Sequence, residues 1–497
     1  MKGKYDAVYG QYVSLDSVLK KFFELPNILK DTLAYMSYLS KENSGLQNFI
    51  QVLKFLENEG ILVQSNLEVK RVYFVLGLLT GDNLGLHQLF GLVESFSASY
   101  FCRLCKMHKK DTQKAVKEDP SLLRNLINYN NDIQLDNTSE TGIKEECVFH
   151  DISSYHFTEN YTVDELHDGR EGLCNVDMLI ILRNLTHGKY KCFNLEILNN
   201  RMLMFGYGPK DSLNKPPRIY KMLCFVRLFG IFVGDLVYED NPYWQLYLLM
   251  RQILDVILAK KLSKGSISYL KVLIQEHHEL FISLAGESLT PKLHFLIHYP
   301  TIIEQSGPIS HLSTIRCEAK QRNLTQAAAS NMSRVNISYS ISVKHQMSLC
   351  HRFLTKEGLI PDLETSPGQT ISFNETLPFI QVLPPELKGS ECTSYKWIKY
   401  KGTTYKLNMV VIVGAENLCP LFGEVNQIII SDSNCPLLLC KKLVNIGLYE
   451  HVLGYEVATT KDWICININD LLDPYPTYAY AMAMANGEKY VILHSNL

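Results

Sequence analysis

The stretch from Lys70 to Lys110 constrains the fold of this chain most strongly. It begins with an almost uninterrupted apolar run, Val72 to Leu79, whose length and content of β-branched and aromatic residues are typical of a strand buried on both faces. A Gly-Asp-Asn sequence follows, so Asp82 lies at the carboxyl end of this predicted strand. Open α/β sheets bind their ligands at that edge. The sequence therefore predicts an α/β core with Asp82 at its functional edge.

The same stretch contains a Cys-x-x-Cys pair, Cys102 and Cys105, which is half of a tetrahedral zinc site. A matching half occurs much further along the chain, where His294 and His298 are four residues apart. On a helix, two histidines at this spacing share one face and can present both imidazoles to one ion. We therefore predict a structural zinc site. The alternative is a pair of buried thiols and two core histidines.

A carboxylate accompanies each half of the predicted zinc site. Asp82 precedes the cysteine pair by twenty residues (102 − 82 = 20), and Glu318 follows the histidine pair by the same interval (318 − 298 = 20). A zinc ion bound by all four ligands would also bring these two carboxylates towards a common site. The sequence thus predicts two acidic residues close to one structural metal.

Several blocks of this sequence resemble one family. The blocks are GDNLGLHQLFGLVESFSASYFCRLCK and PKLHFLIHYP, followed by GPI and RCEAK, and they are similar to the transposases of CACTA-like elements, which are related to the catalytic core of the vertebrate antigen-receptor recombinase. Further family-like blocks are Val163 to Gly172, Leu198 to Asn214 and Leu236 to Trp244. The resemblance covers most of residues 50 to 345, with the motifs in the family's order.

The resemblance implies an RNase H-like sheet with a DDE metal triad, split by a large helical insertion. It matches Asp82 to the second acidic residue of the triad and Glu318 to the third. It also matches the two cysteines and two histidines to zinc ligands. Mg²⁺ or Mn²⁺ would be bound only by an active enzyme.

The first acidic residue of that triad is missing from the expected place. The aspartates before Asp82 are Asp6, Asp16 and Asp31, and none follows a β-type apolar run. Two-metal catalysis depends on the positioning of both ions, so loss of a bridging carboxylate would lower the rate by orders of magnitude. We therefore predict a catalytically inactive, degenerate DDE transposase derivative, lacking its first strands, that is stabilised by zinc and binds DNA or a related protein. The alternative is an active DDE transposase or recombinase that cleaves and transfers DNA strands.

Within the predicted insertion, Asp164, His167 and Asp168 put two carboxylates and an imidazole within about one helical turn. Such a group can coordinate a metal ion, and the resemblance favours this interpretation. The alternative is that Asp164 caps a helix while His167 bonds locally. The adjacent His277 and His278 point in different directions on a helix, and we expect both at the surface.

Basic residues flank the predicted site. Arg316 and Lys320 stand on either side of Glu318, and Lys106 directly follows the cysteine pair. Such charges can neutralise DNA phosphates, although a solvated helix face is the alternative for the lysines. The formal net charge of the chain is only −2, so any DNA contact must rely on local patches of this kind.

The order of patterns predicts six regions in 497 residues. They are an N-terminal helical region (1–65), the first part of the core with the cysteine pair (66–110), a mainly helical insertion (111–288), the second part of the core (289–345), a linker (346–385) and a C-terminal β domain (386–497). In the last region, alternating residues around Lys401-Gly402-Thr403 predict a hairpin within a small antiparallel β-barrel or sandwich.

Cysteine usage and hydropathy bear on the compartment. Thirteen scattered cysteines and the absence of a signal-peptide pattern favour a reducing compartment. No run of eighteen apolar residues occurs, so we expect no membrane span. These observations predict a nuclear protein, or otherwise a cytoplasmic one, whose partners are DNA, a second copy of the chain or a related transposase-derived protein.

Overall fold

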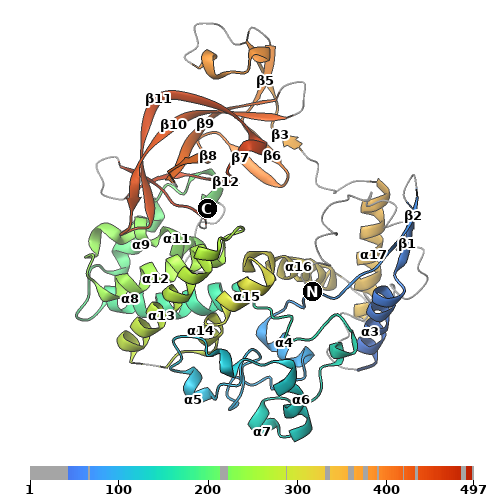
Figure 1. Cartoon of the computed structure of the whole chain (residues 1–497). Helices are drawn as coiled ribbons and strands as arrows, with labels where there is room; N and C mark the ends of the chain where they lie inside the picture. The colour runs from blue at the N-terminus through green and yellow to red at the C-terminus, as the bar shows by residue number, and fades with distance from the viewer. Residues whose placement is uncertain are drawn as a thin grey trace. The chain divides into compact units, whose positions relative to one another are not determined.

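The computed structural model describes residues 43–64, 68–212, 222–286, 288–330, 336–355, 363–372, 379–388, 391–417, 419–430, 435–482 and 488–494. They form helices and antiparallel sheets (Figure 1) in two compact units. Unit 1 comprises Met1–Thr112, Asp119–Asp164 and Leu312–Leu359, and unit 2 comprises Gln113–Glu118, Glu165–His311 and Ile360–Leu497. The helical pattern expected within residues 1–42 lies outside the described residues. Within the described ranges, no helix is long and apolar enough to cross a membrane.

Unit 1 combines helices with long irregular segments. Its described helices are α3 (Asn43–Asn58), α4 (Asn83–Leu89), α5 (Lys109–Thr112), α6 (Leu126–Leu135), α7 (Thr138–Thr141), α16 (Ile315–Ala329) and α17 (Ile337–Thr355). Strands β1 (Ile61–Gln64) and β2 (Val69–Val72) pair as an antiparallel hairpin. Because so much of the backbone lies outside regular elements, side chains must satisfy many of its polar groups.

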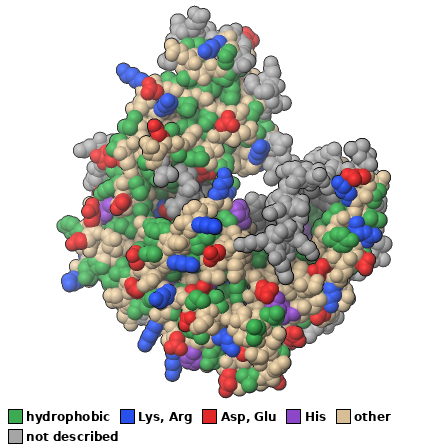
Figure 2. Space-filling view, viewed as in Figure 1, with side chains coloured by type: hydrophobic (Ala, Val, Ile, Leu, Met, Phe, Trp, Pro, Cys, Tyr) green, Lys and Arg blue, Asp and Glu red, His purple; other side chains and the backbone are tan. Residues whose placement is uncertain are grey.

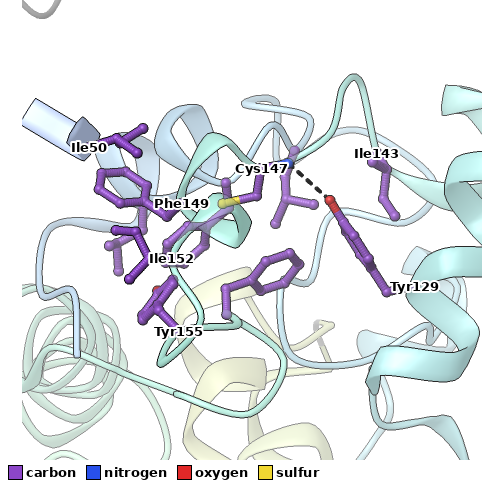
Figure 3. Packing of buried hydrophobic residues seen from close by; sticks show 11 residues of the cluster. Ile50, Tyr129, Ile143, Cys147, Phe149, Ile152 and Tyr155 are labelled. Atoms are coloured by element: carbon purple, nitrogen blue, oxygen red, sulfur yellow. Dashed lines mark hydrogen bonds between the residues drawn. The ribbon is translucent and has the colours of Figure 1, made fainter. Parts of the chain in front are cut away.

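An aromatic cluster forms a core of unit 1 (Figure 3). Phe90, just after α4, stacks on Phe157 with ring centroids 5.0 Å apart, and Tyr129 of α6 meets Phe157 edge to face. The Tyr129 hydroxyl accepts a hydrogen bond of 3.0 Å from the Cys147 backbone N–H. Ile50 of α3 is buried in the same cluster. Three helices are thus fastened to one irregular segment of the chain.

The buried strand expected from Val72 to Leu79 does not form. Strand β2 ends at Val72, and residues 73–80 run without strand pairing and are exposed or half-buried. Loop side chains bind this backbone instead: Asn160 Nδ2 donates to Gly77 O at 2.7 Å, and Thr162 Oγ1 donates to Leu79 O at 2.6 Å. An apolar run becomes a doubly buried strand only when strands pair with it on both sides. The described part of unit 1 supplies no such strands.

The helices of unit 2 lie partly within the predicted insertion (111–288) and partly beyond it. They are a π-helix (Leu166–Leu173), α8 (Cys174–Thr186), α9 (Leu195–Met204), α10 (Gly208–Asp211), α11 (Met222–Val233), α12 (Pro242–Ile257), α13 (Lys264–Ala285), α14 (Pro291–Leu296) and α15 (Tyr299–Ser306). Helix α12 begins where the Asn241 side chain accepts from the Tyr243 and Trp244 N–H groups, with Pro242 at its first position. Residues on both sides of α12 are buried, so it is a central helix of this unit.

The C-terminal part of unit 2 is antiparallel, as expected, but the described strands do not close into a barrel. The larger sheet has the order β12-β8-β9-β10-β11-β14-β13, with β5 also pairing β9 and β4 pairing β5, and a second sheet has the order β3-β6-β7. Their bounds are β3 (Leu363–Thr365), β4 (Gln369–Ser372), β5 (Glu391–Tyr395), β6 (Trp397–Tyr400), β7 (Thr403–Lys406), β8 (Val410–Glu416), β9 (Cys419–Ile430), β10 (Pro436–Tyr449), β11 (Gly454–Asn467), β12 (Asp473–Thr477), β13 (Ala479–Ala481) and β14 (Lys489–Val491).

The predicted hairpin around Lys401 and Gly402 is confirmed. Strands β6 and β7 pair directly, from Trp397 opposite Lys406 to Tyr400 opposite Thr403. Lys401 and Gly402 have φ values of 46° and 81°, as a two-residue turn between twisted strands requires.

Helices and sheet of unit 2 meet at the loop between β10 and β11. Trp244 of α12 donates from Nε1 to His451 O at 2.9 Å, and His451 Nε2 lies 2.9 Å from Gly234 O. A Cβ at Gly234 would lie only 2.7 Å from Val452 Cγ1, so the absence of a side chain there permits this close approach.

Candidate metal centre

The cysteine pair lies in the irregular segment between α4 and α5. An isolated β-bridge pairs Cys105 with Leu123, and backbone hydrogen bonds from Arg124 N–H to Leu104 O (2.9 Å) and from Lys106 N–H to Leu122 O (2.8 Å) extend this contact. The Leu104 N–H also points at Cys102 Sγ, 3.4 Å away. This pairing holds the two-residue spacer in a turn, so both thiols are fixed and buried.

A buried guanidinium lies beside the thiols. Arg124 is only 1% exposed, and it donates from Nε to Cys102 O at 3.1 Å and from Nη2 to Thr141 O at 2.7 Å. The hydrogen bond with Cys102, together with burial, raises the pKa of Cys105 well above its ordinary value. Without a metal the Cys105 thiol therefore stays protonated, whereas a bound cation would favour thiolates.

The two histidines lie on different helical segments and not on one helix as predicted: His294 belongs to α14, and His298 immediately precedes α15. Thr290 caps α14 by accepting from the Leu293 N–H, and His294 and His298 are 0% and 2% exposed. His298 Nδ1 lies 2.6 Å from Glu118 Oε2, and Glu118 Oε1 accepts from Thr301 Oγ1 at 2.5 Å. A carboxylate on Nδ1 fixes the ring orientation and leaves Nε2 as the nitrogen that can bind a metal.

Glu118 is a residue that sequence reasoning missed. It lies in a polar segment without a metal motif, 180 positions from His298. Burial alone would raise the pKa of Glu118, but the hydrogen bond and charge of His298, with the Thr301 hydroxyl, lower it below its ordinary value. No local pattern could have identified Glu118, because its role depends on a contact made only in the folded chain.

The four predicted zinc ligands come together in the structure. Cys102, Cys105, His294 and His298 are all buried, and one ligand atom from each lies within 4.8 Å of the others. A tetrahedral zinc ion with ordinary bond lengths holds such atoms about 3.3 to 3.8 Å apart, so only a small contraction is needed. Thiolate and imidazole donors suit zinc, and two thiolates with two neutral imidazoles cancel its charge. The group could therefore hold zinc.

The acidic residues matched to the triad have different surroundings. Asp82 is exposed and caps α4, because its Oδ1 accepts from the Gly85 N–H at 2.7 Å. Glu318 belongs to α16, but its side chain and those of Arg316 and Lys320 lie outside the described residues. Lys106 Nζ forms an ion pair of 2.7 Å with Asp132, which offsets its charge.

Asp164 is buried and holds the start of α16. Its Oδ1 accepts from the Thr314 N–H at 3.0 Å and its Oδ2 accepts from the Thr314 hydroxyl at 2.5 Å. Thr314 immediately precedes α16, so Asp164 holds the residue at which this helix begins, although α16 has no side-chain cap. His167 is half-buried on the π-helix, and Asp168 accepts from the Tyr299 hydroxyl at 3.2 Å. Among the residues that the structure describes, the Cys/His group is the one cluster with three or more metal-binding side chains.

The expectation that His277 and His278 lie at the surface is wrong. Both are 0% exposed, because α13 packs against both α12 and α15 and so buries adjacent positions of one helix. His277 Nε2 lies 2.5 Å from Asp177 Oδ2, and the two Nδ1 atoms of the histidines lie 2.9 Å apart. Periodicity identifies the most apolar face of a helix but does not show how many neighbours surround it.

No family model and no curated protein matches this chain. The functional interpretation therefore rests on the assembled Cys/His group and its buried partners. The observation with the greatest weight is that two pairs almost two hundred positions apart (294 − 105 = 189) form one buried cluster.

Proposed function

We propose that this chain is a zinc-stabilised, catalytically inactive protein derived from a CACTA-like DDE transposase, and that it binds DNA or a related transposase-derived chain. The assembled Cys/His group carries the proposal. Its four members are the residues that the resemblance matches to zinc ligands, and their side chains lie together and buried. The RNase H-like ancestry of the core is part of this proposal.

A zinc ion in this group would supply structural free energy. Cys102, Cys105, His294 and His298 would hold it, and metal binding to such a set contributes about 10–16 kcal/mol of apparent free energy in small zinc peptides. The ion would be enclosed by protein, with Glu118 bound to His298 and Arg124 bound to the Cys102 carbonyl oxygen. A closed set of four protein ligands is typical of structural zinc, since catalytic zinc keeps a position for water.

Two observations support a protein that has lost catalysis. The segment that leads to Asp82 is an unpaired, largely solvent-facing run instead of a strand within a sheet. A two-metal site needs its carboxylates held in a fixed geometry on rigid elements, and an unpaired run does not supply that rigidity. Asp164, the other acid considered, has both oxygens engaged by Thr314.

Nucleic-acid binding would depend on local groups of basic residues. On the face shown in Figure 2, Lys and Arg side chains are interspersed with Asp and Glu side chains. A mixed surface of this kind gives little long-range attraction for DNA, so we expect weak binding that is detected at low salt. The proposed location is the nucleus, where such a partner is found, with the cytoplasm as the alternative.

A plasmid assay separates this function from an active transposase. Purified chain is incubated with supercoiled plasmid and Mn²⁺, beside the Glu318→Gln variant and the exposed-site control Glu171→Gln. We expect no nicking by any of the three proteins, with plasmid retained in a gel-shift assay at low salt. Nicking by the wild type and by Glu171→Gln, abolished in Glu318→Gln, would establish the active enzyme instead.

A further inference from the structure

A buried chain of hydrogen-bonding side chains crosses unit 2 behind the histidine pair. Asp177 of α8 contacts His277 of α13, His277 contacts His278, and His278 Nε2 lies 3.0 Å from the Leu293 carbonyl oxygen of α14. All three side chains are 0% exposed. Leu293 directly precedes the metal-site residue His294. Three helices are therefore connected by one buried polar path.

The partners determine where the protons of this path lie. A carbonyl oxygen only accepts, so His278 Nε2 must carry a hydrogen and donate to Leu293 O. Burial, followed by the proximity of His277, lowers the pKa of His278 well below its ordinary value, so this ring is neutral and its Nδ1 is an acceptor. His277 Nδ1 must then be the donor across the 2.9 Å contact. The direction of the whole path follows from one carbonyl group.

One proton is left for the contact between Asp177 and His277. With its Nδ1 hydrogen already committed, His277 Nε2 shares a single proton with Asp177 Oδ2 across 2.5 Å. Burial raises the pKa of Asp177 although His277 opposes this effect, and Asp177 Oδ1 has no hydrogen-bond donor within the described ranges. Either protonation assignment leaves the pair neutral overall, which is what a fully buried site requires.

We infer that Asp177, His277 and His278 are positioning residues that fix the first turn of α14 through the Leu293 carbonyl and so orient His294 towards the metal. This inference rests on the proposed zinc site. Where α14 ends, the Ile297 N–H bonds to His294 O and Phe295 O, and His278 is a donor from a neighbouring helix to the Leu293 carbonyl. The contact from His278 therefore determines how that carbonyl, and the adjacent ligand residue, are held.

The proton positions along this path predict different effects on zinc affinity for two substitutions of Asp177. In Asp177→Asn the side-chain Nδ2–H can donate to His277 Nε2, so the path keeps every hydrogen bond and stays neutral. In Asp177→Leu, which has the same branching at Cγ but no polar atom, that nitrogen loses its partner and the path is broken. We expect zinc affinity, measured by competition with a chromophoric chelator on the full chain, to stay within about 3-fold for Asp177→Asn. For Asp177→Leu we expect it to fall about 10-fold, at the lower end of what outer partners contribute.

Two further readouts do not depend on affinity alone. The visible spectrum of the Co²⁺-substituted chain should be unchanged in Asp177→Asn and altered in Asp177→Leu, because ligand orientation changes the ligand field. Nitrogen-15 NMR of the wild type should show hydrogen on Nε2 of His278 and on Nδ1 of His277. The NMR result tests the proton positions along the path even if Asp177→Leu does not fold.

Each alternative outcome has a definite meaning. Equal zinc affinity and equal Co²⁺ spectra in folded Asp177→Leu and wild type would overturn the positioning role, and so would the opposite histidine tautomers. A loss of zinc affinity in Asp177→Asn as large as in Asp177→Leu would contradict the inference that Asp177 and His277 share one proton. A wild-type chain that binds no zinc would instead contradict the proposed function. The tautomer measurement would still test the proton positions along the path.

Discussion

Substitution of Glu118 tests how the histidine half of the metal centre is held. Glu118 Oε2 lies 2.6 Å from His298 Nδ1, and Glu118 Oε1 accepts from the Thr301 hydroxyl. Glu118→Gln keeps an oxygen that can accept from His298 Nδ1 but removes the negative charge. Its NH₂ group then faces the Thr301 hydroxyl, which must rotate to accept a hydrogen bond. Glu118→Ala removes both contacts.

The expected magnitudes follow from these contacts. Loss of an outer carboxylate partner typically lowers metal affinity by about 10–100-fold, or roughly 1.4–2.7 kcal/mol. We expect about 10-fold for Glu118→Gln, which retains the hydrogen bond to His298 without the charge, and about 100-fold for Glu118→Ala, which retains no contact. The measurement is zinc competition with a chromophoric chelator, and exposed Glu171, which is 3.7 Å from Lys292 Nζ, provides the control Glu171→Gln.

The ranking of these variants is as informative as the magnitudes. Wild type and Glu171→Gln should bind zinc equally, and the two Glu118 variants should follow in the order Gln, then Ala. If folded Glu118→Ala binds zinc as tightly as wild type, then the carboxylate does not orient His298, and the description of this half of the site is wrong.

Three further predictions concern unit 1. In its aromatic core, Tyr129→Phe should lower the free energy of unfolding by about 1–3 kcal/mol because the Cys147 N–H loses its acceptor. Tyr155→Phe should be neutral or stabilising because the buried Tyr155 hydroxyl has no hydrogen-bond partner within the described residues. Denaturant midpoints would measure both variants, and a larger loss of stability for Tyr155→Phe would contradict the packing. Burial, followed by the nearby His156, lowers the pKa of His150 to about 3. The unfolded chain therefore binds a proton at this histidine first, and the stability of unit 1 should fall as the pH drops from about 6.5 towards 3. Equal denaturant midpoints at pH 7 and pH 5 would refute this prediction. Asp164→Ala should accelerate amide hydrogen exchange at the start of α16, and unchanged protection there would show that the contacts with Thr314 do not hold the helix.

Sequence patterns predicted the parts of this structure that depend on local chemistry. The hairpin at Lys401 and Gly402 follows from alternating residues around a turn that needs positive φ, and the helices between residues 166 and 285 lie in the region where helical patterns were expected. The four candidate zinc ligands could be named because zinc requires particular residue types at short spacings within each half, and the resemblance joined the halves.

The remaining features depend on contacts that no local pattern contains. The apolar run from Val72 to Leu79 has the composition of a buried strand, but pairing requires neighbouring strands that the described chain does not place there. His277 and His278 are polar residues on a helix that neighbours surround, so composition suggested the wrong environment. Glu118 has a role only because folding brings it to His298.

The most direct test of the account is the zinc content of the purified full chain, measured by native mass spectrometry and elemental analysis. We expect one zinc per chain in the wild type and in Cys147→Ser, which changes a buried cysteine outside the cluster, and none in the double variant Cys102→Ser, His298→Asn. Removal of the metal by a chelator should lower the melting temperature of the wild type. A wild-type chain that is folded without zinc, with the same melting temperature before and after chelation, would contradict the central claim.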